Sequence, residues 1–253
     1  MSPDRWIFIT AGLGNSNFED AAIRLLKDVN RFQVFESLVY LNNNNIESLC
    51  PTVSKKYKKF LRANVRGFGF MSWKAEIIHR TLDSNPEAGI IWADCGCEAI
   101  VNCLTKRSLV HKLNRASKEG YIAFNLNTEE YRYTKRELFD FFPILSSSDK
   151  SPQFQTTFFG LHGDLGRKIA KRWFEVVSAE ISTVNEISKV GEQQGFVCHR
   201  HDQSVFSLVM KELNLEANMK PIRSGKTMRS QILSKLHEPF IASRNRSGLK
   251  SYK

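Results

Sequence analysis

Apolar positions along the chain follow two different periods. Residues 5–10 (RWIFIT) form a short apolar run before a glycine-rich stretch, and apolar residues then recur at helical spacing over residues 18–29. Similar short runs at 37–41, 89–93, 121–125 and 154–161 predict strands, and one-sided apolar stripes at 75–82, 108–118 and 165–177 predict helices. This alternation predicts an α/β fold with a mostly parallel sheet and helices on both faces.

Three further helices are expected from local signals. Residues 54–63 form a basic stretch, Thr134 precedes Glu137 in a capping-box pattern, and apolar residues at 205, 208, 209 and 213 predict a helix from His201 onward. The composition changes only near residue 220. We therefore expect one domain over residues 1–219 and a loosely structured basic segment over residues 220–253.

The size and composition suit a single large core. The chain has 253 residues, of which 42% are hydrophobic, and its apolar runs are shorter than the roughly 20 residues that span a bilayer. The first residues lack a signal-peptide pattern, and the five cysteines have no disulfide framework spacing. We expect reduced thiols and a cytoplasmic protein, with peripheral membrane contact as an option.

The formal net charge of +11 is concentrated in two segments. Residues 55–66 contain six basic residues and no acidic one, and residues 220–253 contain nine basic residues and one acidic residue. Such segments suit nucleotide phosphates, an anionic membrane surface that carries a lipid-linked acceptor, or nucleic acid. A solvated cationic face explains residues 55–59 equally well.

The first predicted strand ends in a glycine-rich turn. Gly12 and Gly14 form part of a dinucleotide-binding fingerprint whose third glycine is absent. Ligands of open α/β sheets bind at the carboxyl ends of the strands. This placement makes Thr10 and Ala11 candidate nucleotide contacts.

Residues 89–98 (GIIWADCGCE) carry the strongest chemical signal. A buried strand that ends at Asp94 places a carboxylate at the carboxyl edge of the sheet. There a divalent cation, Mn²⁺ or Mg²⁺, could join the carboxylate to a diphosphate. Asp94 is therefore the candidate metal ligand.

This segment resembles the DxD-type motif of GT-A glycosyltransferases, in the Asp-Ala-Gly-Cys form of a group of bacterial and viral polysaccharide-biosynthesis proteins related to the family-eight transferases. Residues 66–74 (RGFGFMSWK), 134–139 (TKRELF) and 199–208 (HRHDQSVFSL) resemble the same group in the same order. The resemblance covers most of the chain. Gly96 stands where a complete motif has its second aspartate, which leaves cation dependence open.

The resemblance implies a GT-A nucleotide-diphospho-sugar transferase that moves a hexosyl or related sugar to a saccharide acceptor, either lipid-linked or part of a glycoprotein glycan. It implies donor contacts for Arg24, Trp73 and Lys74, and catalytic roles for Asp202 and Gln203. The basic C-terminal segment could close over the donor.

Two mechanisms and two other functions stay open. Asp202 could act as a general base with inversion, or Asp202 and Gln203 could flank the sugar in a retaining reaction, which the resemblance favours. A nucleic-acid-binding protein explains the charge but gives Asp94 and the residues 201–203 no role. A catalytically inactive transferase-like module is the other alternative.

Overall fold

The computed structural model describes residues 5–219 and 238–243, and its centre is a five-stranded sheet. The strand order is β2 (Ser37–Asn42), β1 (Arg5–Gly12), β3 (Ala88–Ala93), β8 (Phe158–Leu161) and β5 (Tyr121–Ile122). β1 is parallel to both of its neighbours, whereas β8 is antiparallel to β3 and to β5. The predicted α/β class with a mostly parallel sheet is confirmed, and the reversed β8 is a feature that the sequence did not predict.

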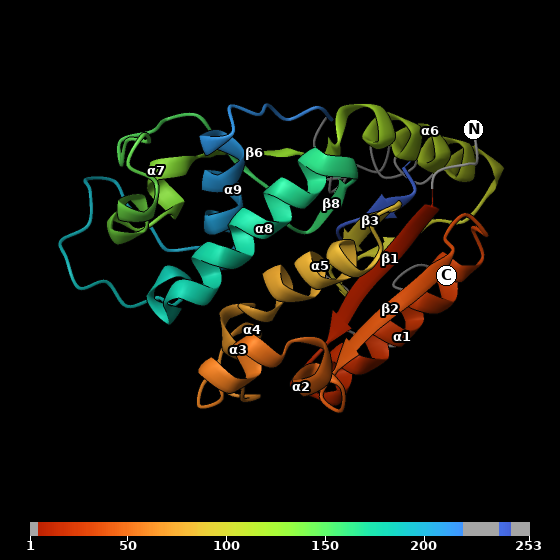
Figure 1. Cartoon of the computed structure of the whole chain (residues 1–253), viewed down its shortest axis with the longest axis horizontal. Helices are drawn as coiled ribbons and strands as arrows, with labels where there is room; N and C mark the ends of the chain where they lie inside the picture. Colours follow the sequence, from red (N-terminus) through yellow and green to blue (C-terminus); the bar gives the residue numbers. More distant parts are fainter. Residues whose placement is uncertain (1–4, 220–237, 244–253) are drawn as a thin grey trace.

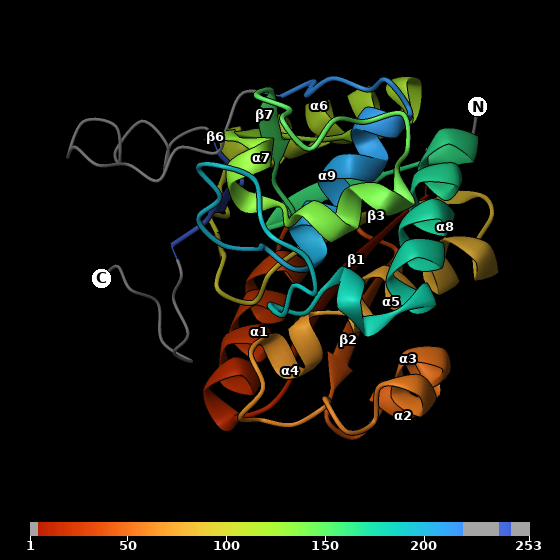
Figure 2. The ribbon, with the colours of Figure 1, turned by 90° about the vertical axis from the view of Figure 1, so that its left-hand side faces the viewer.

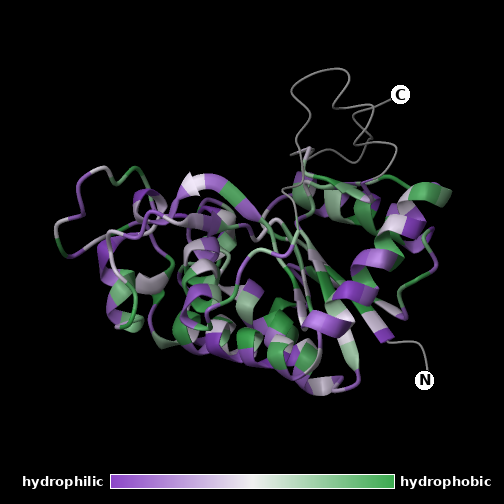
Figure 3. Cartoon of the chain, turned by 90° about the horizontal axis from the view of Figure 1, so that it is seen from above, coloured by the Kyte–Doolittle hydropathy of each residue, from purple (hydrophilic) through white to green (hydrophobic). Residues whose placement is uncertain are grey.

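Alternate side chains of β1 pack into two hydrophobic cores, one on each face of the sheet. Trp6 and Phe8 join the core beneath α1 (Ser16–Asn30) and α6 (Cys103–Glu119). Ile7 and Ile9 point to the other face, which α5 (Trp73–Ser84), α8 (Gly163–Ala179) and α9 (Asp202–Glu212) cover. The helices therefore lie on both sides of the sheet (Figure 1). In Figure 3 the helices show hydrophobic and hydrophilic colours side by side, as amphipathic helices do.

Short elements complete the fold. Between β2 and α5 lie α2 (Ile46–Leu49), α3 (Pro51–Lys56) and α4 (Gly67–Phe70). β6 (Asn125–Glu129) pairs with β7 (Pro152–Phe154) beside α7 (Glu130–Tyr133), near α9 (Figure 2). Two 3₁₀ helices are also present: η1 (Arg136–Phe141) comes after α7, and η2 (Ile181–Thr183) comes after α8. β4 (Glu98–Ala99) pairs with β9 (Phe240–Ile241).

Four predicted elements were wrong in detail, and one of them is the strand expected over residues 121–125, where β5 ends at Ile122 and Asn125 begins β6 in another sheet. The helix expected over residues 54–63 is the shorter α3, because the hydroxyl of Tyr57, just beyond it, donates to the Val177 carbonyl of α8 at 2.8 Å. Thr134 caps no helix, since its hydroxyl donates to Glu130 and η1 begins at Arg136. The strand expected over residues 154–161 is divided into β7 and β8, which belong to different sheets.

Part of the predicted loose C-terminal segment belongs to the folded core. Residues 220–237 and 244–253 lie outside the described residues. Phe240 is 1% exposed, and its ring lies 4.8 Å from Phe158 and 5.8 Å from Phe8 between ring centroids. Loose structure is therefore the wrong expectation for residues 238–243. None of the described helices has the length and apolar character that a membrane crossing requires.

Candidate functional site

The carboxyl end of β3 brings a tryptophan and an aspartate to one face of the sheet. Trp92 and Asp94 are two residues apart on extended chain, so their side chains point the same way, toward α5. The indole Nε1 of Trp92 donates to Asp94 Oδ1 at 2.8 Å. Thr10, at the end of β1, donates its hydroxyl to the Ala93 carbonyl at 2.7 Å. These bonds fix the backbone and side chain at the point where β3 ends.

A buried ammonium joins two carboxylates at this edge. Lys74 Nζ lies 3.0 Å from Asp94 Oδ1 and 2.8 Å from Asp202 Oδ2. The side chains of Lys74 and Asp202 are 2% and 3% exposed, whereas that of Asp94 is 39% exposed. Thr156 donates a further hydrogen bond to Asp202 Oδ2 at 3.2 Å. The cluster is therefore closed on the Asp202 side and open to solvent at Asp94.

The electrostatics of the cluster keep Lys74 charged. Burial is the largest single influence on the pKa of Lys74 and acts to lower it, but the charges of Asp202 and Asp94 together outweigh burial and raise the pKa. The ammonium also lies 5.0 Å from the centre of the Trp92 ring, a cation–π distance. One positive and two negative charges leave the cluster able to accept further positive charge near Asp94.

Two segments of strained backbone lead into this cluster. Residues 67–71 all have positive φ, among them Phe68 at 51°, Phe70 at 58° and Met71 at 58°. Left-handed conformation costs non-glycine residues about 1–2 kcal/mol each. This left-handed turn directly precedes α5 and Lys74.

The second strained segment is a single residue, His201, which has φ 53° and ψ −126° and directly precedes Asp202. Its Nδ1 lies 2.7 Å from the Val184 carbonyl, and burial lowers the pKa of its ring. The rings of His201 and Phe70 stack, with centroids 5.5 Å apart. Backbone strain of this kind persists where the surrounding structure enforces it, commonly at functional sites. Here the two strained segments touch each other and lead into the two buried members of the ion cluster.

The remaining predicted donor contacts lie around the cluster in structural roles. Arg24, buried on α1, donates from Nη2 to the carbonyls of Cys95 and Cys97 at 3.0 and 2.8 Å, and so shapes the loop after Asp94. Trp73 donates from Nε1 to the Gly67 carbonyl at 3.1 Å. The side chain of Ala11 is buried in β1. Contact of these residues with a donor stays a prediction.

Gln203 belongs to an adjoining polar cluster. Its amide donates to Gln153 Oε1 at 2.7 Å, and Arg200 Nη1 donates to the same oxygen at 3.2 Å. The structure therefore brings Lys74, Asp94 and Asp202 together, with Gln203 one residue beyond. Sequence reasoning missed Trp92 and Thr156; the strand alternation could have indicated Trp92, but Thr156 lies between two strands without a pattern of its own.

Asp94 is the solvent-exposed carboxylate of the cluster and the one placed to hold a divalent cation. Both hydrogen bonds to Asp94 fall on Oδ1, and within the described chain no donor reaches Oδ2. Mg²⁺ at phosphate-transfer sites commonly takes one or two carboxylates and completes its coordination with phosphate oxygens and water. Asp94 fits that role, which stays a prediction.

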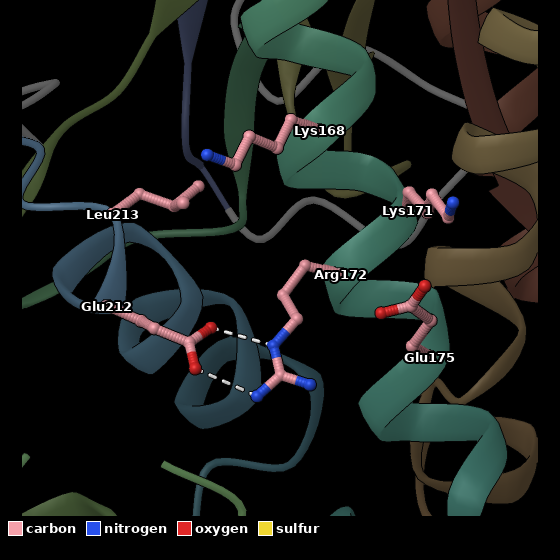
Figure 4. Close-up of a pocket in the computed structure, with 6 residues that line it drawn as sticks. All are labelled: Lys168, Lys171, Arg172, Glu175, Glu212 and Leu213. Atoms are coloured by element: carbon pink, nitrogen blue, oxygen red, sulfur yellow. Dashed lines mark hydrogen bonds and ion pairs between the residues drawn. The ribbon is translucent and has the colours of Figure 1, made fainter. Parts of the chain in front are cut away.

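A basic groove lies elsewhere on the molecule. The groove is lined by Lys168, Lys171, Arg172 and Glu175 of α8 and by Glu212 and Leu213 at the end of α9; in Figure 4 Lys168 and Arg172 point toward α9, whereas Lys171 and Glu175 lie on the other side of α8. Arg172 forms a bidentate ion pair with Glu212, at 2.7 and 2.9 Å. Asp202 begins α9 and Glu212 ends it, so the length of the helix, about 16 Å, separates this groove from the candidate site.

The sequence matches no protein-family model and no curated protein. Three glycosyltransferases are among the solved structures that this chain matches, all at low sequence identity. Mouse xyloside xylosyltransferase 1 is 10% identical, with a TM-score of 0.46 over 97% of this chain and 100% of the other. A glycosyltransferase involved in the glycosylation of the major capsid of PBCV-1 is 9% identical, with a TM-score of 0.39 over 68% of this chain and 66% of the other. The bifunctional glycosyltransferase WbbM is 9% identical, with a TM-score of 0.47 over 94% of this chain and 45% of the other.

Proposed function

We propose that the chain is a GT-A type glycosyltransferase that moves a sugar from a nucleotide-sugar donor to a saccharide acceptor. The observation that carries the proposal is the Lys74–Asp94–Asp202 cluster at the carboxyl edge of a mostly parallel sheet, the edge at which such sheets bind nucleotides. Strained backbone leads into both Lys74 and Asp202. The motifs that resemble glycosyltransferases contain all three residues of the cluster.

In this proposal the donor diphosphate lies at Asp94, beyond Thr10 and Ala11 at the end of β1. An ammonium has three N–H donors, and Lys74 gives two of them to carboxylates. The third is the group that would stabilise the phosphate charge. A divalent cation on Asp94 Oδ2 would neutralise the leaving diphosphate.

Asp202 and Gln203 are the proposed groups beside the reacting sugar. Lys74 and Thr156 hold Oδ2 of Asp202, and Gln153 orients the amide of Gln203. Because α9 is anchored by buried residues, both side chains are fixed in position, as transfer at an anomeric carbon demands. We propose the retaining course, in which the pair flanks the sugar.

Donor binding tests the proposal directly. In a thermal-shift screen of UDP-, GDP-, CMP- and dTDP-sugars with Mn²⁺ or Mg²⁺, one donor at about 100 times its Kd should raise the melting temperature by about 5–10 °C. Asp94→Asn should remove the part of the shift that depends on the cation, because the substitution deletes the charge that binds it. Asp164→Asn, an exposed change on α8, is the matched control and should keep the full shift.

A shift that is indifferent to chelator and to Asp94→Asn would remove the cation from the proposal. The absence of any donor shift would remove the nucleotide-sugar itself, and a shift without turnover would indicate an inactive transferase-like module. With a donor identified, Asp202→Asn and Gln203→Ala should each lower kcat, and NMR of the product should show a retained anomer. Unchanged turnover in both variants would contradict the catalytic assignment, and an inverted product would contradict the retaining course.

A further inference from the structure

The basic segment, residues 55–66, begins in the last turn of α3 and presents several cations without an acidic partner among the described residues. The side chains of Lys55, Lys58 and Arg62 are exposed, and among the described residues none of the three has an ion pair or a side-chain hydrogen bond. Lys59 is also exposed, over the ring of Phe60. The segment is anchored to α8, because the buried hydroxyl of Tyr57 donates to the Val177 carbonyl. Its charges therefore face solvent on a fixed backbone.

An apolar loop tip lies on the neighbouring part of the surface. Ile187 is 71% exposed and Val190 is 48% exposed. The loop is anchored from within, since the buried ammonium of Lys135 donates to the carbonyl and side-chain oxygens of Asn185 at 3.3 and 3.0 Å and to the Ile187 carbonyl at 2.8 Å. Folding gains little from Ile187, yet its backbone is fixed with the side chain outward.

Two sets of contacts join the basic segment to this loop. Lys56 Nζ donates to the carbonyls of Ser178 and Ala179, both at 2.6 Å, at the end of the helix that leads into the loop. Arg66 pairs with Glu186 at 3.4 Å, beside Ile187. Figure 2 faces this end of the molecule, with α3, α4 and the loop on the viewer's side. These contacts place the cations of the basic segment and the exposed aliphatic side chains of the loop on adjoining parts of the molecule.

We propose that this surface, formed by Lys55, Lys58, Lys59, Arg62, Ile187 and Val190, docks on a bilayer that contains anionic phospholipid. Unpaired lysines and arginines are attracted to the negative surface potential of such a bilayer, and aliphatic side chains among them enter the interface. Nucleic acid would use the cations but would leave Ile187 and Val190 in water. The combination favours lipid as the partner.

The surface borders the candidate site. Ala63, in the basic segment, lies against Gly14 at the carboxyl end of β1, and Phe70, after Arg66, stacks on His201. A docked bilayer would therefore lie close to the sheet edge that holds Lys74 and Asp94. The docking itself does not depend on glycosyl transfer, and its test needs no enzyme activity.

Flotation of the full chain with vesicles tests the docking. Vesicles of three parts phosphatidylcholine to one part phosphatidylserine should bind the chain, pure phosphatidylcholine vesicles should not, and raised salt should release it. Each cation near an anionic surface contributes about a fivefold increase in partition. Lys55→Glu with Lys58→Glu should therefore lower the partition by about 25-fold or more, and Ile187→Ser should lower it by about three- to tenfold.

The chain offers matched controls outside the six residues of the proposed surface. Lys168 and Lys171 have the same three-residue spacing, and Ile144 is 70% exposed, close to the value of Ile187. Lys168→Glu with Lys171→Glu, and separately Ile144→Ser, should leave the partition unchanged within about threefold. All variants alter exposed side chains and should keep the melting temperature of the parent.

Three results would overturn the proposal. One is the absence of preference for the anionic vesicles, and another is an equal loss in the matched control variants, which would show that net charge alone decides binding. The third is unchanged binding in the surface variants, which would place the contact elsewhere in the chain. Tighter binding to a single-stranded oligonucleotide, lost in Lys55→Glu with Lys58→Glu but kept in Ile187→Ser, would assign the surface to nucleic acid instead.

Discussion

At the scale of single residues, Lys74 supplies the positive charge that compensates the buried carboxylate of the candidate site. Its ammonium is the partner of a carboxylate, Asp202, that is 3% exposed. A buried charge without a counter-charge is strongly unfavourable, whereas a buried pair contributes little net stability. Loss of either partner would leave an uncompensated buried charge, and this cost is what keeps the two residues paired in the folded state.

Replacing Lys74 tests this balance. Lys74→Met keeps the volume and removes the charge, so the free energy of unfolding, measured with urea, should fall by about 3–5 kcal/mol. The double variant Lys74→Met with Asp202→Asn removes the stranded carboxylate and should recover part of that loss. Lys168→Met, an exposed change on α8, should alter stability by less than about 0.5 kcal/mol. A single variant as stable as the parent, or a double variant no better than the single one, would contradict the buried-pair account.

The same residues show how far sequence reasoning reaches. Asp94 follows a fully buried strand, so its place at the sheet edge could be predicted from the pattern alone. Lys74 and Asp202 are 128 positions apart, and no local pattern pairs them; only the motifs that resemble glycosyltransferases indicated both. Thr156 could not be predicted, because its contact depends on where β7 and β8 separate.

At the scale of elements, long periodic segments were predictable and short ones were not. The stripes that predicted α8 and α9 match continuous buried faces on the core. The basic residues 54–63 share helical spacing, but tertiary contacts of Tyr57 and the left-handed turn after Arg66 override it. One apolar run became β7 and β8, since periodicity cannot show that a strand changes sheets.

The close packing of β1 on α1 explains Gly12 without any ligand. A Cβ on Gly12 would lie 2.6 Å from the Phe18 carbonyl oxygen and 2.8 Å from Glu19 Cα, both backbone atoms of α1. Gly12→Ala should therefore push α1 from the sheet and lower the free energy of unfolding by about 1–3 kcal/mol. Gly191→Ala, where a Cβ meets open space, is the control and should be neutral or slightly stabilising. Equal effects in chemical denaturation would show that β1 and α1 tolerate separation.

At the scale of the whole molecule, residues 238–243 pack with the rest of the described chain as one unit. The core beneath α1 and α6 includes Phe240, which follows a stretch that the structure does not describe. β9 adds backbone pairing to β4, directly after the loop that carries Asp94 and Cys97. The division at residue 220 that composition suggested thus crosses the packing of the core.

If residues 238–243 are part of that unit, truncating Phe240 should weaken the whole domain. Phe240 is 1% exposed among Phe8, Phe32 and Phe158, so Phe240→Ala removes a ring from the centre of an aromatic cluster. Unfolding by urea should remain a single transition with an unchanged slope, and its free energy should fall by about 3–5 kcal/mol. Leu104→Ala, at a side chain 47% exposed, should change it by less than about 0.5 kcal/mol. Because an independent appendage would unfold without its neighbours, an unchanged main transition in Phe240→Ala would show that residues 1–219 are stable without β9.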